Sequence, residues 1–195
     1  MCANRIYVQS GIHDAFVARL SVAVAKLKVG NGMEPDSVLG PLINESSKAK
    51  FEDHIADAVS KGAKVVTGGK PHPLGGTYVM PTLIEGVTTK MKVAREETFA
   101  PLAPVFKFET VDEVIALAND TEFGLAAYFF ANNLKQVWKV VEALEYGMVG
   151  VNTGLISTEV APFGGVKQSG FGREGSKYGL DDFMSMKYVC LGGMG

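Results

Sequence analysis

The sequence of 195 residues is poor in the residue types that mark disulfide or metal sites, with only two cysteines and three histidines. Cys2 and Cys190 lie at opposite ends of a chain for which no export signal is expected. Such cysteines are typical of reduced thiols rather than of a structural disulfide. His13, His54 and His72 share no metal-ligand spacing with the cysteines or with one another. No metal site is therefore predicted.

The sequence also lacks charge imbalance and long apolar runs. The formal net charge is −2, and no long basic or acidic run occurs, so neither nucleic acid nor an anionic membrane is expected as a partner. The longest apolar runs, such as residues 124–131, are far shorter than the roughly 20 residues that cross a bilayer. We expect a globular protein of the cytoplasm, with the mitochondrial matrix as the alternative.

The apolar pattern alternates between strand and helix periodicity along the chain. Strands are predicted at residues 5–9, 63–67, 80–87, 103–108, 125–131 and 148–151. Helices are predicted at residues 12–27, after Asn44 up to Gly62, from a Thr110–Glu113 capping box, and from Asn133 up to Gly147. This alternation predicts an α/β fold with a largely parallel sheet flanked by helices. We expect one domain, residues 1–179, followed by a tail, residues 180–195.

Within the tail, residues 181–191 have strand character. A terminal strand without a local partner either docks on the edge of its own sheet or adds to the sheet of another subunit. The sequence pattern by itself does not choose between these two roles.

Residues 161–175 carry five glycines, one proline and two phenylalanines. Glycines in such density indicate positive φ angles or the close approach of another backbone or a ligand, although a tight surface connection has the same composition. Phe163 and Phe171 are placed where aromatic rings could line a pocket. Residues 170–175 match the spacing G-x-G-x-x-G, but they follow a loop and precede only a terminal strand, so we do not interpret them as a phosphate cradle.

Three motifs carry a resemblance to the aldehyde dehydrogenase superfamily. Residues 162–174 resemble its C-terminal signature loop, residues 96–101 (EETFAP) its Glu-Glu-x-Phe-Gly-Pro segment, and residues 2–5 (CANR) the residues after its catalytic cysteine. Residues 154–160 and 175–179 are similar to the succinate-semialdehyde dehydrogenase branch. The resemblance implies the fold of the aldehyde dehydrogenase catalytic domain. It also implies that this chain is the C-terminal portion of such an enzyme.

The resemblance assigns cofactor roles to two residues. Glu97 would hold the nicotinamide ribose, and Phe99 would lie beside the nicotinamide ring. On extended backbone, residues two apart project to the same face, so Glu97 and Phe99 could face the cofactor together. The alternative without a function is a solvated glutamate beside a core phenylalanine. Ala100 stands where the family usually has glycine, and Glu96 is expected to be structural. The resemblance implies NAD or NADP as the cofactor. This sequence does not distinguish the two, because the residue that recognises the 2′ position of the adenosine ribose belongs to a dinucleotide-binding domain upstream.

Ser157 and Phe163 are the substrate-binding candidates. By resemblance, Ser157 presents a hydroxyl to the far carboxylate of the aldehyde, and Phe163 lines the aldehyde tunnel. The alternative for Ser157 is a solvated serine, and the alternative for Phe163 is ordinary packing within the loop. Lys167 and Arg173 are expected to be solvated, and Asn152 to cap the end of its strand.

The catalytic nucleophile of this branch lies two residues before the cysteine that matches Cys2, so no catalytic residue is assigned within this chain. In some family members the cysteine at the position of Cys2 pairs with the nucleophile as a redox switch. A disulfide across one intervening residue is strained and readily reduced, which suits that role.

Two functions follow from these patterns. The first is the C-terminal part of an NAD(P)-dependent enzyme that oxidises succinate semialdehyde to succinate through a cysteine thiohemiacetal and thioester. The second is a catalytically inactive fragment that keeps the fold and the subunit contact. The family extends its tail onto a neighbouring subunit, so a homo-oligomer is expected.

Overall fold

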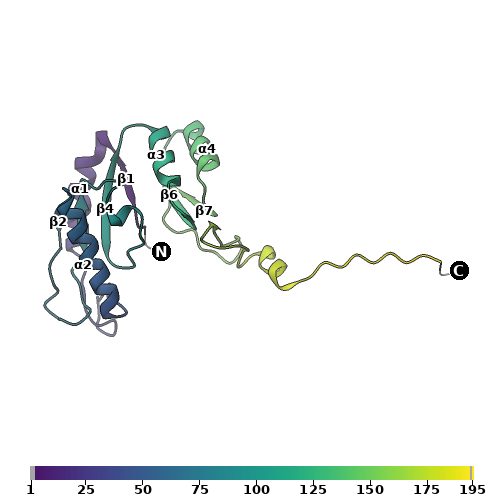
Figure 1. Ribbon diagram of the computed structural model, residues 1–195, viewed down its shortest axis with the longest axis horizontal. Coiled ribbons are helices and arrows are strands. Elements are labelled where there is room, and N and C mark those ends of the chain that lie inside the picture. The colour runs from purple at the N-terminus through teal and green to yellow at the C-terminus, as the bar shows by residue number, and fades with distance from the viewer. Residues whose placement is uncertain (1–2, 194) are drawn as a thin grey trace. The chain divides into compact units, whose positions relative to one another are not determined.

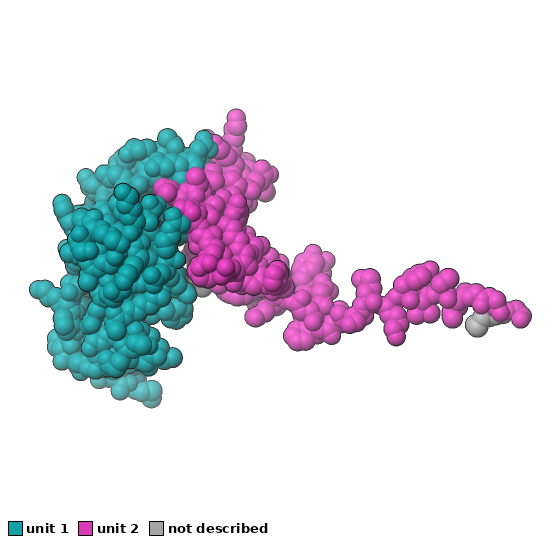
Figure 2. All heavy atoms as spheres, in the orientation of Figure 1, with its two compact units in different colours: residues 1–114 teal, residues 115–195 magenta. Residues whose placement is uncertain are grey.

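The computed structural model describes residues 3–193 and 195, and Cys2 lies outside the described residues. The described chain forms two compact units, residues 3–114 and residues 115 onward (Figure 2). The functional boundary predicted between residues 179 and 180 is a separate matter and stays a prediction.

The first unit is built on a four-stranded sheet (Figure 1). Its strands are β1 (Ile6–Gln9), β2 (Lys64–Thr67), β3 (Thr82–Glu85) and β4 (Leu102–Phe108), in the order β1-β4-β3-β2. Both β1 and β3 run parallel to β4, and β2 pairs antiparallel with β3. The predicted α/β fold with a largely parallel sheet is confirmed.

Two helices cover the two faces of this sheet. Side chains alternate across a strand, so Leu83 and Ile84 enter different apolar clusters. Leu83 packs with Val17 of α1 (Ser10–Ala25), and Ile84 lies in the cluster that contains Phe51 of α2 (Glu45–Ser60). The result is a three-layer arrangement with the core on both sides of the central strands β3 and β4.

The predicted helix ends are partly confirmed. The Asn44 side chain accepts a hydrogen bond from the Ser47 amide at 2.8 Å, and Gly62 has a positive φ of 101° after α2. Thr110 and Glu113 form the predicted capping box, with side-chain bonds to each other's amide of 3.2 and 3.3 Å. The helix expected to continue to residue 27 ends at Ala25 instead, because its last turn tightens into bonds three residues back.

In three helices, some apolar side chains at helical spacing lie outside the core. Ile12 of α1 and Val59 of α2 are exposed, and α2 instead buries His54 and Ala58. In α4 (Leu134–Ala143), which Asn133 caps as predicted, Trp138 is exposed and the buried side chain is that of Val140. Apolar spacing alone does not show which of two adjacent helical positions faces the sheet.

The second unit contains short paired strands. β6 (Ala126–Phe129) runs parallel to β7 (Met148–Val151), and β5 (Phe123–Gly124) pairs antiparallel with β8 (Val166–Lys167). The helix α3 (Val111–Asn119) begins in the first unit, and α4 follows β6. The single strand predicted at residues 125–131 is thus present in a shorter form, and the strand predicted at 148–151 is confirmed.

The tail is not a strand in the described chain. A short 3₁₀ helix, η2 (Lys177–Phe183), occupies its start, and residues 184–193 have no regular structure (Figure 1). A strand needs hydrogen bonds from a neighbouring strand, and this single chain offers none to the tail. Throughout the described residues, the helices are too short or too polar to cross a membrane.

Candidate functional site

Residues 96–100 follow the short 3₁₀ helix η1 (Lys92–Ala94), and from residue 97 to residue 100 they alternate between exposed and buried. Glu97 and Phe99 are exposed, Phe99 with 79% of its surface accessible, while Thr98 and Ala100 are buried. Residues 97–99 form neither helix nor strand, so no backbone ladder holds them. The two residues predicted to face the cofactor therefore share the outer side of one short segment.

Thr98 fixes this segment through all three of its polar groups. Its amide donates to the Asn4 Oδ1 atom at 3.2 Å, and its carbonyl accepts from the Ala100 amide at 2.8 Å. Its hydroxyl lies 2.6 Å from the Nδ1 atom of His54. Thr98 is thus held by partners from the N-terminal segment, from its own segment and from α2.

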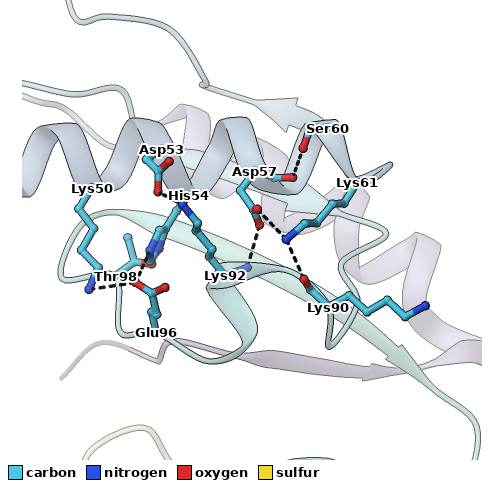
Figure 3. Close-up of polar contacts among 10 residues, drawn as sticks. All are labelled: Lys50, Asp53, His54, Asp57, Ser60, Lys61, Lys90, Lys92, Glu96 and Thr98. Carbon is cyan, nitrogen blue, oxygen red and sulfur yellow. Dashed lines mark hydrogen bonds and ion pairs between the residues drawn. The ribbon is translucent and has the colours of Figure 1, made fainter.

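His54 is wholly buried, with 0% of its surface exposed, and both of its ring nitrogens have partners. Its Nε2 atom lies 3.3 Å from the Glu96 carboxylate, which also lies 3.7 Å from the Lys50 ammonium (Figure 3). Glu96 was expected to be structural, and its contacts with α2 agree with that role. The imidazole joins residues 96 and 98, on either side of Glu97.

A second group of polar contacts continues along the same face of α2 (Figure 3). The Asp57 carboxylate accepts from the Lys92 amide at 2.8 Å and pairs with the Lys61 ammonium at 2.6 Å, while Lys92 pairs with Asp53 at 2.7 Å. The hydrogen bond from Lys61, followed by that from the Lys92 amide, lowers the pKa of Asp57 below its usual range. The Asp53 carboxylate raises the pKa of Lys92. The face of α2 thus binds residues 90–98 at several points.

In the second unit, the glycine-rich segment, residues 161–175, requires glycine for the two reasons predicted. A Cβ atom on Gly147 would lie 2.0 Å from the carbonyl oxygen of Gly164, and one on Gly164 would lie 2.6 Å from the carbonyl oxygen of Gly172. Gly170, Gly172 and Gly175 have positive φ angles of 110°, 75° and 65°. Close backbone approach and left-handed backbone together explain the glycine content.

The segment encloses one side of a hollow of about 590 Å³. Phe163 is half-buried in its wall and is fixed by two backbone bonds to Glu174, of 2.8 and 2.7 Å. Phe171 and Phe183, both exposed, also line it. The structure thus brings the predicted pocket residue Phe163 together with Phe171. Ser157 is exposed in the preceding loop and does not line this hollow.

The two cationic side chains of this segment, Lys167 and Arg173, donate hydrogen bonds to backbone carbonyls. The Lys167 ammonium donates to the carbonyls of Asn119 and Thr121 and pairs with Glu145 at 2.5 Å. Arg173 donates from Nη1 to two carbonyls of the glycine-rich segment, at 2.8 and 2.6 Å. Both residues were expected to be solvated. Lys167 is exposed, in line with that expectation, and Arg173 is only partly exposed; the backbone bonds of both were not foreseen.

Asn152 behaves as predicted for a strand cap. It follows β7, and its side chain forms two hydrogen bonds of 2.9 Å with the backbone of Ala131.

Among the described residues no three His, Cys, Asp or Glu side chains gather as they would around a metal ion, and Cys190 is an exposed thiol. The described chain therefore offers two separate features for binding: an exposed carboxylate beside an exposed ring in the first unit, and a hollow lined by aromatic rings in the second.

Sequence analysis missed His54 as part of this arrangement. The available signal was the spacing of Lys50, Asp53, His54 and Asp57, which places four polar side chains on one side of a helix. It was overlooked because the helix was already predicted from Asn44 and Gly62 at its ends and from apolar periodicity between them. Asn4, whose side chain bonds the Thr98 amide, carries no signal of its own in the sequence.

Comparison with known proteins gives relatives across the whole length of the chain. Glutarate-semialdehyde dehydrogenase of Pseudomonas aeruginosa is 63% identical over 194 residues, which cover 100% of this chain and 40% of that protein. Succinate-semialdehyde dehydrogenase [NADP(+)] of Escherichia coli is 58% identical, with 98% and 40% covered. The crystal structure of succinate-semialdehyde dehydrogenase from Burkholderia pseudomallei superimposes with a TM-score of 0.96 at 59% identity, covering 97% of this chain and 39% of that one.

These relatives also bear on the cofactor and on length. One dehydrogenase of this group is named for NADP(+), and another was solved in complex with NAD+. The chain spans about 40% of the length of the relatives it matches. The model of the aldehyde dehydrogenase family matches residues 1–189. The chain therefore belongs to the aldehyde dehydrogenase family.

Proposed function

We propose that this chain is the C-terminal part of an NAD(P)-dependent dehydrogenase that oxidises succinate semialdehyde to succinate. The observation that carries the proposal is the segment of residues 96–100, in which Glu97 and Phe99 face outward while Thr98 is fixed inward. This is the arrangement that the family resemblance calls for at a nicotinamide site. The motif matches at residues 2–5 and 162–174 support the assignment of the chain to the C-terminal part.

The residues present fit a nicotinamide nucleotide. A carboxylate such as that of Glu97 can accept hydrogen bonds from two ribose hydroxyls, and an exposed ring such as that of Phe99 offers an apolar face to the nicotinamide. The methyl group of Ala100, which replaces the usual glycine, is buried in the core of the first unit. It therefore points away from the side on which the dinucleotide would bind.

The proposed chemistry divides between this chain and residues outside it. A cysteine thiolate adds to the aldehyde carbon to give a thiohemiacetal, which loses hydride to become a thioester that water hydrolyses. The dinucleotide supplies the hydride acceptor. In this scheme Glu97 and Phe99 position the dinucleotide, Phe163 lines the aldehyde tunnel and Ser157 contacts the far carboxylate of the substrate. Cys2 lies beside the nucleophile and acts as its redox partner.

The relative named for glutarate semialdehyde gives a specific second candidate substrate. Glutarate semialdehyde is longer than succinate semialdehyde by one methylene group. A pocket discriminates one methylene by only about 1–3 kcal/mol, so both substrates can be turned over by one site. The ratio of their kcat/KM values decides which one the pocket fits better.

A hybrid dehydrogenase tests both substrates. In it, residues 2–195 replace the matching 40% of the Escherichia coli enzyme, which is 58% identical and supplies the remaining length. We expect aldehyde-dependent formation of NADPH with a higher kcat/KM for succinate semialdehyde than for glutarate semialdehyde. The reverse order would assign the chain to the five-carbon substrate. A folded hybrid that is inactive with both semialdehydes would contradict the proposed function.

We also propose that residues 180–195 contact a second copy of the chain. Phe183, Met186 and Tyr188 are exposed, and a row of large apolar side chains on an unpaired segment favours association. Light scattering of the full chain should give a mass above that of a monomer, and deletion of residues 184–195 should lower it. A full chain that stays monomeric at micromolar concentration would refute this role.

A further inference from the structure

We propose that His54 is a positioning residue that holds Glu97 and Phe99 toward the dinucleotide by fixing Thr98 between them. The inference rests on the proposed function, because it explains how the two cofactor-facing residues are oriented. His54 lies on α2 and would act on the cofactor site through Thr98, without contacting the dinucleotide itself.

The protonation of the ring follows from its partners. A carboxylate only accepts hydrogen bonds, so the Nε2 atom of His54 carries a proton that it donates to Glu96 across 3.3 Å. The Thr98 hydroxyl can donate or accept, and it lies 2.6 Å from Nδ1. Both nitrogens of a wholly buried imidazole are thereby satisfied, as a buried polar ring requires.

These two contacts surround Glu97. One reaches residue 96 and the other reaches residue 98, so the ring joins the chain on both sides of the proposed ribose ligand (Figure 3). Side chains alternate along a segment of this kind, and holding Thr98 inward turns Glu97 and Phe99 outward. The shorter bond, to Thr98, lies entirely within the core, whereas Glu96 is half exposed to water. The bond to Thr98 is therefore the one expected to set the orientation.

Side-chain contacts are needed to orient residues 97–99, because their only backbone–backbone bond described here stays within the segment, between Thr98 and Ala100. Residues 97–99 belong to no helix or strand, and the Thr98 amide and carbonyl are already bonded to Asn4 and Ala100. An apolar side chain at position 54 could fill the same volume without requiring a partner. A histidine there is satisfied only when Thr98 points inward, so it favours this one conformation of the segment.

The test compares four variants of the hybrid dehydrogenase. Thr98→Val removes the hydroxyl at constant shape, and Thr98→Ser retains it. His54→Asn keeps a polar group near the position of Nδ1, whereas His54→Gln keeps one near Nε2. Loss of one partner of a buried hydrogen bond corresponds to roughly a tenfold change in an equilibrium constant. We expect Thr98→Val and His54→Gln to raise the KM for NADP roughly tenfold, with the KM for succinate semialdehyde unchanged, and Thr98→Ser and His54→Asn to remain close to the parent.

Asp57→Ala is the matched control for a structural effect. It removes a contact from the same face of α2, but one that holds Lys92 rather than the segment beside Glu97. It should lower the melting temperature without changing the KM for NADP. Equal KM values for Thr98→Val and Asp57→Ala would overturn the proposal.

Hydrogen exchange of the 195-residue chain separates this inference from the proposed function. Thr98→Val should speed exchange at the amides of Thr98 and Ala100 at least tenfold, and leave the amide of Lys92 unchanged. If the parent hybrid is inactive, the proposed function fails, while exchange still decides whether Thr98 is held as described. Unchanged exchange at both amides would overturn the positioning role whatever the activity.

Discussion

The contact between Gly147 and the glycine-rich segment gives the sharpest structural prediction. In Gly147→Ala the added Cβ would lie 2.0 Å from the Gly164 carbonyl oxygen and 2.8 Å from the Gly165 Cα atom. Carbon and oxygen atoms normally approach to about 3.3 Å, so one of the two backbone segments must move by roughly 1 Å. Overpacking typically costs 1–3 kcal/mol, and rigid backbone on both sides leads us to expect about 3 kcal/mol.

The measurement is thermal unfolding together with amide exchange. A unit of this size loses roughly 4–8 °C per kcal/mol, so Gly147→Ala should lower its melting temperature by roughly 15 °C. The amides of Phe163 and Glu174, which bond each other's carbonyls, should exchange faster because their segment is the one displaced. In the hybrid dehydrogenase the KM for the aldehyde should rise.

Gly154→Ala is the control, since no heavy atom lies within 4 Å of a Cβ atom built at Gly154. This surface change should stay within about 0.5 kcal/mol of the parent. If the two variants unfold at the same temperature, the account of the glycine-rich segment as a close-packed backbone crossing is wrong.

Three further predictions concern individual side chains. Folding lowers the pKa of Asp57, so between the folded pKa and the ordinary pKa near 3.9 the unfolded chain binds more protons than the folded chain. The free energy of unfolding should therefore fall as the pH drops through that window. Asp57→Asn should weaken this pH dependence in acid denaturation curves. Glu97→Gln should lower kcat/KM for NADP in the hybrid by roughly 10–100-fold through loss of a charged acceptor, and an unchanged value would remove Glu97 from the site. Arg173→Met should destabilise the second unit by about 2 kcal/mol in chemical denaturation, since two backbone carbonyls lose their donor; a loss below about 0.5 kcal/mol would show that these bonds are replaced by water.

Much of the fold could be predicted because local chemistry determines it. Asn44, Gly62 and the Thr110–Glu113 box act within a few residues of themselves, and all three appear as expected. Strand alternation likewise predicted the sheet, since neighbouring side chains must face opposite layers. The tail was mispredicted because strand propensity describes a side-chain preference, while a strand forms only where a second backbone supplies bonds.

The site was predictable only to the extent that its residues carry motifs. Glu97, Phe99, Ser157 and Phe163 were singled out by resemblance, and their functional roles stay predictions. His54 was not found, because its importance depends on Thr98, 44 residues away in the sequence. The backbone bonds of Lys167 were not foreseen for the same reason, since its carbonyl partners lie at the last residue of α3 and two residues after it. Contacts between residues this far apart in sequence depend on how the chain packs, so they leave no pattern in the sequence around either residue.

We propose that this chain supplies cofactor-facing and aldehyde-facing residues of a semialdehyde dehydrogenase, while the nucleophile comes from outside the chain. The direct measurement is NADPH formation with succinate semialdehyde, by the 195-residue chain alone and by the hybrid dehydrogenase. The account predicts no turnover by the chain alone and turnover by the hybrid that survives Cys2→Ala. Turnover by the chain alone that is abolished by Cys2→Ala would contradict it.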